Sequence, residues 1–158
     1  MKKPRKRVLI PVDGSQFSLE ILPAVKQFLE SRSNELILLH VTEMPNWLSN
    51  DEVAEGDTAT YPEHEAVALE ASFRSSLQSS IDELTAAGFE VITAIAFGEP
   101  MPEIERFIAE EGVDLVAMTT HGRTGLARMF LGSVAQHLVN HAAVPVLLVR
   151  SFAQAKPE

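Results

Sequence analysis

The sequence predicts an open, doubly wound α/β domain, in which a five-stranded parallel sheet carries four helices distributed over both faces. Five apolar runs of strand length recur along the 158-residue chain, and near-continuous apolarity is typical of strands buried on both faces. Segments with the helical period of 3.6 residues separate these runs. Alternation of strand and helix is the pattern of a parallel sheet covered by helices.

Each apolar run is expected to form one strand. Pro145 lies at the start of the last run, where a proline costs the sheet no ladder hydrogen bond. The five runs are Val8 to Val12, Leu36 to Val41, Val91 to Phe97, Val113 to Met118 and Val144 to Val149.

Four helices are expected between the strands, three of them marked by apolar side chains at helical spacing. Gly88 and Gly112 lie where C′ glycines end the second and third helices, and the fourth runs from about Ser133 to Ala143. Pro23 lies inside the first pattern, so that this helix either bends there or starts later than Ser18. The three apolar faces consist of Ile21, Leu22, Val25, Phe28 and Leu29, of Phe73, Leu77, Ile81 and Leu84, and of Ile104, Phe107 and Ile108.

The segment from Glu43 to Glu65 interrupts this alternation. It holds seven acidic residues, two prolines and no Lys or Arg, and it is longer than an ordinary connection. We therefore expect an acidic loop or lid here, within a single domain that spans residues 1–158 and ends in a tail over residues 151–158.

The charge of the chain argues against two classes of partner. Five of its 13 Lys and Arg lie in the first seven residues, so that the other eight oppose all 22 Asp and Glu. Such an acidic body repels phosphate backbones, and neither nucleic acid nor a membrane is an expected partner.

The chain has no cysteine, which excludes disulfides and thiolate metal sites. No apolar stretch reaches the roughly 18 residues of a membrane helix. We expect a cytoplasmic protein.

The carboxyl ends of the strands are the expected binding region, because ligands of doubly wound sheets bind there, where the strand order reverses. Small or polar residues follow four of the strands. They are Asp13-Gly14-Ser15, Val41-Thr42-Glu43, Gly98-Glu99-Pro100 and Thr119-Thr120-His121-Gly122.

The fourth of these ends continues into a glycine-rich segment, THGRTGLARMFLGS, over residues 120–133. Its glycines allow a ligand to approach the backbone, and the free N–H groups at the start of the following helix attract anions. Arg123 and Arg128 add positive charge, which favours a phosphate site. The chain lacks the Gly-Lys pair of a Walker A loop, and from spacing alone a tight loop without a ligand is the alternative.

Three segments together resemble the universal stress protein family: MTTHGRTGLARMFLGSVA, the VPVLLV that follows it, and VLIPVDGS near the start. The resemblance spans essentially the whole chain. It implies a parallel sheet of strand order 3-2-1-4-5 and a homodimer paired through the last strand, Val146, Leu147, Leu148 and Val149. In the family's nucleotide-binding motif two glycines match Gly122 and Gly132, whereas Thr119 stands where the family has its first glycine.

The resemblance also implies an adenine-nucleotide site, with ATP as the ligand and Mg²⁺ or Mn²⁺ carried by the nucleotide. Asp13 would accept hydrogen bonds from the ribose, Val41 would meet the base through its backbone, and Gly98 would lie near the sugar. The full set of implied binding residues is Pro11, Val12, Asp13, Val41, Gly98, Met118, Thr119, His121, Gly122, Arg123, Gly132, Ser133 and Val134.

Several of these residues also have a purely structural interpretation. Asp13 can cap a helix or form an Asx-turn with Gly14 and Ser15, and Ser133 can be the N-cap of the fourth helix. His121 can be a structural loop histidine. His137 and His141 share a helix face, and a surface pair is favoured over a metal pair because no third ligand is nearby.

The expected function is that of a homodimeric stress-response protein that signals by nucleotide occupancy, with at most slow ATP hydrolysis. No general base is evident beside the terminal phosphate, and the GxSxG pattern of a serine hydrolase is absent. One alternative is a partner-binding dimer of the same fold that binds no nucleotide, which the Thr119 departure favours. Another is an enzyme that uses Glu55, Asp57 or His64 of the acidic segment.

Overall fold

The computed structural model describes residues 4–43, 61–120 and 132–151, and every structural statement below refers to these residues. They form one parallel sheet with the strand order β3-β2-β1-β4-β5, which confirms the predicted topology. The strands are β1 (Lys6–Pro11), β2 (Asn34–Thr42), β3 (Glu90–Phe97), β4 (Leu115–Thr120) and β5 (Val146–Arg150).

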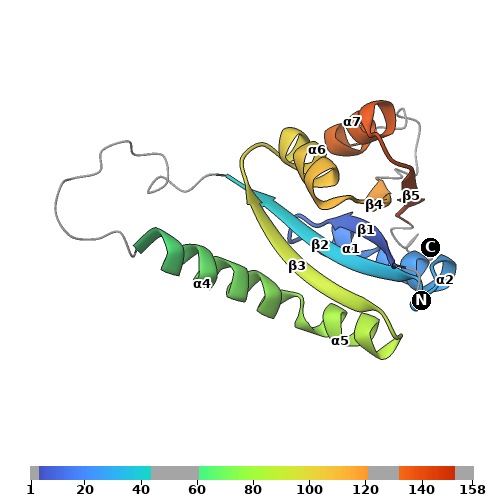
Figure 1. Ribbon diagram of the computed structural model, residues 1–158, viewed down its shortest axis with the longest axis horizontal. Coiled ribbons are helices and arrows are strands. Elements are labelled where there is room, and N and C mark those ends of the chain that lie inside the picture. The colour runs from blue at the N-terminus through green and yellow to red at the C-terminus, as the bar shows by residue number, and fades with distance from the viewer. Residues whose placement is uncertain (1–3, 44–60, 121–131, 152–158) are drawn as a thin grey trace, which may run out of the picture.

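Helices cover both faces of the sheet (Figure 1). On one face lie α2 (Leu22–Phe28), α4 (Tyr61–Ser76) and α5 (Gln78–Ala86), and on the other lie α6 (Pro100–Glu111) and α7 (Ser133–His141). Side chains alternate between the two cores along each central strand: Val8 and Ile10 of β1 pack toward α2, and Leu9 packs toward α6 and α7. All three are fully buried, so the continuous apolar run of β1 reflects a strand covered on both sides.

The first predicted helix is divided. A single turn, α1 (Gln16–Leu19), precedes α2, and Pro23 lies in the first turn of α2, where its missing N–H leaves no helical hydrogen bond unmade. The second alternative, a helix that starts after Ser18, is therefore confirmed for α2. The assignment of Phe28 to the buried face was wrong: its side chain is 68% exposed at the end of α2, because the chain leaves the helix there.

The second predicted helix is also in two parts, since α4 and α5 meet at Leu77. All four of its predicted core side chains are buried. The helix begins earlier than expected, because Tyr61 to Glu65 belong to α4 rather than to a loop. Residues 44–60 of the acidic segment lie outside the described residues.

Gly112 ends α6 in the left-handed conformation with φ 61°, as predicted for a C′ glycine. None of the helices described here has the length and apolarity needed to cross a membrane.

Candidate functional site

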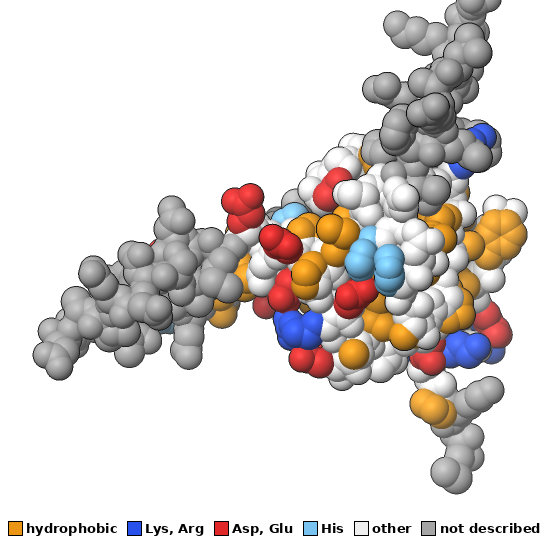
Figure 2. Space-filling model, turned by 90° about the horizontal axis from the view of Figure 1, so that it is seen from above, with side chains coloured by type: hydrophobic (Ala, Val, Ile, Leu, Met, Phe, Trp, Pro, Cys, Tyr) orange, Lys and Arg blue, Asp and Glu red, His pale blue; other side chains and the backbone are white. Residues whose placement is uncertain are grey.

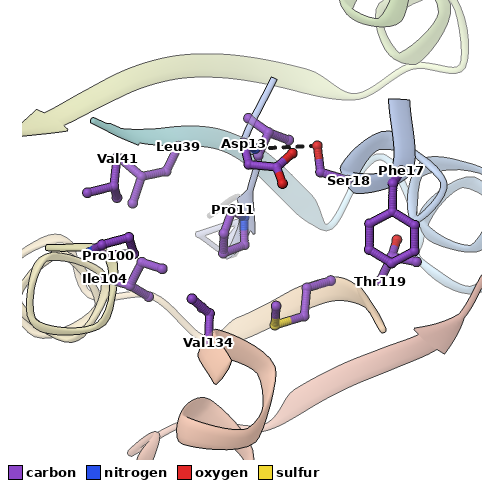
Figure 3. Close-up of a pocket in the computed structure, with 12 residues that line it drawn as sticks. Pro11, Asp13, Phe17, Ser18, Leu39, Val41, Pro100, Ile104, Thr119 and Val134 are labelled. Atoms are coloured by element: carbon purple, nitrogen blue, oxygen red, sulfur yellow. Dashed lines mark hydrogen bonds between the residues drawn. The ribbon is translucent and has the colours of Figure 1, made fainter. Parts of the chain in front are cut away.

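A cavity of about 170 Å³ opens at the carboxyl ends of β1 and β4 (Figure 3). β1 pairs with β2 on one side and with β4 on the other, so this is the point at which the strand order reverses and where ligands of such sheets bind. The lining residues are Pro11, Val12, Asp13, Phe17, Ser18, Leu39, Val41, Pro100, Ile104, Met118, Thr119 and Val134.

The two ends of the cavity differ in chemistry (Figure 3). Leu39 and Val41 of β2 lie beside Pro100 and Ile104 of α6 and form an apolar end. Phe17 and Ser18 of α1 and Thr119 of β4 line the other end, so hydroxyl groups enter the lining there. The arrangement suits a ligand with a flat apolar part and a polar extension.

Asp13 lies at the start of the turn that follows β1 (Figure 3). Its Oδ1 accepts from the backbone N of Ser15 at 2.9 Å and from Ser15 Oγ at 2.6 Å, which is an Asx-turn. Partial burial acts to raise the pKa of the Asp13 carboxyl, but hydrogen bonds from Ser15, together with the Ser18 side chain and the Asp13 backbone, outweigh it and leave that pKa below its ordinary value. The Asp13 residue is exposed and lines the cavity, so a ligand can reach its ionised carboxylate.

Thr119 is the residue that departs from the family's glycine, and its side chain is 6% exposed. Its Oγ1 is the one buried side-chain polar atom without a hydrogen-bond partner in the described part of the protein. Such orphaned groups are costly in folded proteins. Because Thr119 also lines the cavity, a bound ligand is a natural partner for this hydroxyl.

The start of α7 faces the same region through Val134, which lines the cavity. The N-cap is Gly132, not Ser133 as one interpretation held; Ser133 is the first helical residue, and no side chain of the described residues caps the helix. The first internal hydrogen bond of α7 runs from Gln136 N to Gly132 O at 2.9 Å. The N–H groups of the first turn are therefore without a capping side chain.

Seven of the thirteen implied binding residues line the cavity, and Gly98, Gly132 and Ser133 are described but do not line it. Gly98 has φ 141°, a backbone conformation that residues with a Cβ rarely adopt, and a Cβ built there would lie 3.0 Å from Glu103 Cγ, so the backbone conformation accounts for glycine at this position. His121, Gly122 and Arg123 lie outside the described residues. The seven lining residues are Pro11, Val12, Asp13, Val41, Met118, Thr119 and Val134.

Sequence reasoning missed five residues that also line the cavity: Phe17, Ser18, Leu39, Pro100 and Ile104. For two of these, Leu39 and Ile104, the sequence pattern could have indicated the position. Leu39 is two residues before Val41 on one strand and therefore shares its face, and Ile104 belongs to the apolar face of α6. Phe17 and Ser18 had none, because their placement depends on the short α1 turn.

The face covered by α6 and α7 is mixed, with acidic and histidine side chains among apolar ones (Figure 2). The rings of His137 and His141 stack with centroids 4.6 Å apart, and His137 Nε2 lies 2.8 Å from Glu105 Oε1. Among the described residues no group of three or more His, Asp or Glu is placed to hold a metal ion.

The alternative enzyme hypothesis named three residues of the acidic segment. Of these, His64 is exposed on α4, and Glu55 and Asp57 lie outside the described residues.

The fold and its cavity define a class: a doubly wound α/β protein with a small-molecule cleft at its switch point. The universal stress protein family model matches residues 4–150, and the chain belongs to that family. This confirms the resemblance seen in its motifs.

Individual relatives agree with this assignment. Universal stress protein MJ0577 of Methanocaldococcus jannaschii is 31% identical over 153 residues, which cover 92% of this chain and 94% of the relative. YxiE of Bacillus subtilis is 28% identical, over 91% of this chain and 98% of the relative. The solved structure of MJ0577 matches with a TM-score of 0.68 at 29% identity, over 99% of this chain and 100% of that one. A family protein of Arabidopsis thaliana, solved with AMP bound, shares the fold with a TM-score of 0.62 at 18% identity, over 97% of this chain and 96% of that one.

Proposed function

We propose that this protein binds an adenine nucleotide, ATP in particular, in the cavity at the ends of β1 and β4. The observation that carries the proposal is the combination of an apolar end, a carboxylate and an orphaned hydroxyl in one switch-point cavity. Solved family members with cAMP, AMP and dAMP support the same ligand class.

The base of the nucleotide would lie at the apolar end. Leu39, Val41, Pro100 and Ile104 provide surfaces for a purine ring there, and burial of its faces favours binding. The cavity is smaller than the roughly 300 Å³ or more of pockets that enclose a whole drug-sized ligand. The described residues would therefore hold the base and sugar, with the phosphates extending beyond them.

The sugar would lie beside Asp13. Its ionised carboxylate accepts hydrogen bonds and donates none, which matches the two hydroxyl groups of a ribose. The hydrogen bonds of the Asx-turn orient the carboxylate before the ligand arrives. Prior ordering of this kind lowers the entropic cost of binding.

The phosphates would lie between Thr119 and the start of α7. The uncapped first turn of this helix favours an anion, and the family motif adds His121, Gly122 and Arg123. Mg²⁺ or Mn²⁺ would then be carried by the phosphates rather than by a dedicated cluster of protein side chains.

We further propose that the protein signals a stress response by nucleotide occupancy and hydrolyses ATP slowly or not at all. Asp13 is the titratable side chain in the lining described here, and its lowered pKa makes it a weak base at the sugar end. Adenine nucleotides are abundant in the cytoplasm, which is the location we propose.

A homodimer through β5 is part of the proposal. β5 is an edge strand of the sheet. Pro145 O accepts from Val116 N, and Ser151 N donates to Thr120 O, so the backbone groups of Pro145 and Ser151 face β4. Successive residues of a strand direct their backbone groups to opposite sides. The backbone groups of Val146 and Leu148 therefore face the open edge. Leu148→Lys places a charge on that edge and is expected to give monomers in analytical ultracentrifugation. A Leu148→Lys protein with an unchanged dimer would contradict this interface.

The second candidate function is a partner-binding dimer without a nucleotide, and the observation in its favour is the Thr119 side chain in place of a glycine. The two functions are separated by denaturing the purified protein and analysing the supernatant by anion exchange. Calorimetric titration of the refolded, nucleotide-free protein with millimolar ATP then follows. No released nucleotide and no heat of binding would refute ATP binding and favour the second function.

Gly132→Val tests the position of the phosphates. A Cβ at Gly132 meets no atom of the described residues within 4 Å, and its φ of −55° is open to any residue, so the described part of the fold should tolerate valine. The branched side chain would occupy the approach to the first turn of α7, and ATP binding should be lost. Gln136→Val, on the exposed side of the same helix, is the control and should bind ATP normally. Unchanged affinity in Gly132→Val would refute the placement.

A further inference from the structure

His40 of β2 makes two contacts on the side of the sheet opposite the apolar end of the cavity. Its Nδ1 lies 2.9 Å from the backbone oxygen of Val12, and its ring stacks on Phe73 of α4 with centroids 5.2 Å apart. A carbonyl oxygen only accepts hydrogen bonds, so Nδ1 carries the proton and donates. Phe73 is buried and limits the orientation of the ring.

The Val12 oxygen bonded by His40 is the one that the β1–β2 ladder would use next. Pro11 pairs with Leu39, and Val12 N donates to Leu39 O at 2.8 Å. In a parallel ladder the following bond runs from Val41 N to Val12 O. That bond is not made, since pairing ends at Pro11 and Leu39.

The orientation of the next residues of β2 shows where the backbone of Val41 points. Gly98 N donates to Thr42 O at 2.9 Å, so the carbonyl of Thr42 faces β3. Backbone groups of successive residues alternate in direction along a strand, and the N–H and C=O of Val41 therefore face the β1 side, beyond the last paired residue of β1. Val41 lines the cavity at that point.

We propose that His40 is a positioning residue for base recognition. By occupying the Val12 carbonyl it ends the ladder one bond early, which leaves the donor and acceptor of Val41 open to the edge of a base. It also anchors the residue that precedes Asp13. The inference rests on the proposed nucleotide site and deepens it: adenine presents an acceptor, N1, beside a donor, its amino group, whereas guanine reverses the two.

The first test needs no ligand. Hydrogen exchange of the Val41 amide, followed by NMR in the nucleotide-free protein, should be fast in the wild type. In His40→Leu the Val12 carbonyl is released and the ladder can extend, so exchange at Val41 should slow by about tenfold or more. His40→Asn, whose Nδ2 takes the place of Nδ1, should keep it fast. A slow Val41 amide in the wild type, or no change in His40→Leu, would overturn the inference.

The second test measures affinity for ATP, GTP and ribose 5-phosphate. His40→Leu should lose about tenfold in ATP affinity and most of the preference over GTP, with ribose 5-phosphate unaffected and His40→Asn restoring ATP binding. Asn34→Leu is the matched control, because Asn34 Nδ2 donates to the Glu30 carbonyl at 2.8 Å at the other end of β2. An equal loss for all three ligands would assign His40 a merely structural role and overturn the inference. A wild type that binds none of them refutes the proposed function, and the exchange experiment alone then decides on His40.

Discussion

Thr119→Val should change stability and ligand affinity in opposite directions. Valine has nearly the shape of threonine but no hydroxyl, and Thr119 Oγ1 is buried without a partner in the described structure. A buried polar group without a hydrogen bond costs about 1–3 kcal/mol. Removing it from the nucleotide-free protein should therefore raise the free energy of unfolding by about 1 kcal/mol, or Tm by about 2–4 °C in a domain of this size.

The same substitution removes a hydrogen bond from the complex. If Oγ1 bonds to the ligand, its loss should weaken ATP binding by about 1 kcal/mol, which is about fivefold in Kd. Urea unfolding of the nucleotide-free protein measures the first quantity, and isothermal titration calorimetry measures the second. A gain in stability together with a loss of ATP affinity would show that the hydroxyl bonds to the ligand and not to another group of the free protein.

Thr93→Val is the matched control for this experiment. Thr93 is 8% exposed, but its Oγ1 accepts from Arg74 Nη1 at 3.4 Å, so valine there should lower stability and leave ATP affinity unchanged. A Thr119→Val protein that is less stable than the wild type would show that the hydroxyl is already bonded in the free protein. That result would refute the reasoning.

Two further predictions concern the turn after β1 and the helix α2. Despite partial burial, hydrogen bonds, chiefly those from Ser15, leave the Asp13 pKa below its ordinary value of about 3.9. The ionised carboxylate therefore stabilises the fold above that pH. This contribution to the free energy of unfolding is lost as pH falls through the lowered pKa. Asp13→Asn should therefore flatten the fall in unfolding free energy below about pH 4, and an unchanged slope would contradict this. Phe28→Ser should alter stability by no more than about 0.5 kcal/mol in urea unfolding, whereas Ile21→Ala, at a fully buried position, should cost about 2–5 kcal/mol.

The topology was predictable because buried strands leave a clear apolar pattern in the sequence. Strands such as β1 are covered on both faces, and their continuous apolar runs identify them without reference to the rest of the fold. The errors lie at helix ends. Phe28 fits the helical period, but whether the last turn of α2 is covered depends on where the chain leaves it, and no local pattern encodes that.

The candidate site was predictable to the extent that it follows from topology. The switch-point rule located the ends of β1 and β4, and the cavity opens there. The lining residues Phe17 and Pro100 belong to neighbouring helices, whose approach depends on packing across the sheet. His40 gave no signal at all, because a histidine within an apolar strand looks like any other partly buried residue.

The structural and the binding interpretations of the site residues are not exclusive. The Asx-turn holds Asp13 through its Oδ1, so the same geometry that follows β1 also orients the carboxylate that would meet a sugar. At α7 the N-cap is a glycine that provides no side chain to its first turn, and the buried Thr119 hydroxyl of β4 has no hydrogen-bond partner among residues 4–43, 61–120 and 132–151. The buried hydroxyl costs stability in the free protein, whereas the exposed Asp13 carboxylate is solvated and stabilises the fold when it is ionised. Both groups lie in the lining of one cavity, and α7 reaches it through Val134, so one ligand can contact all three elements.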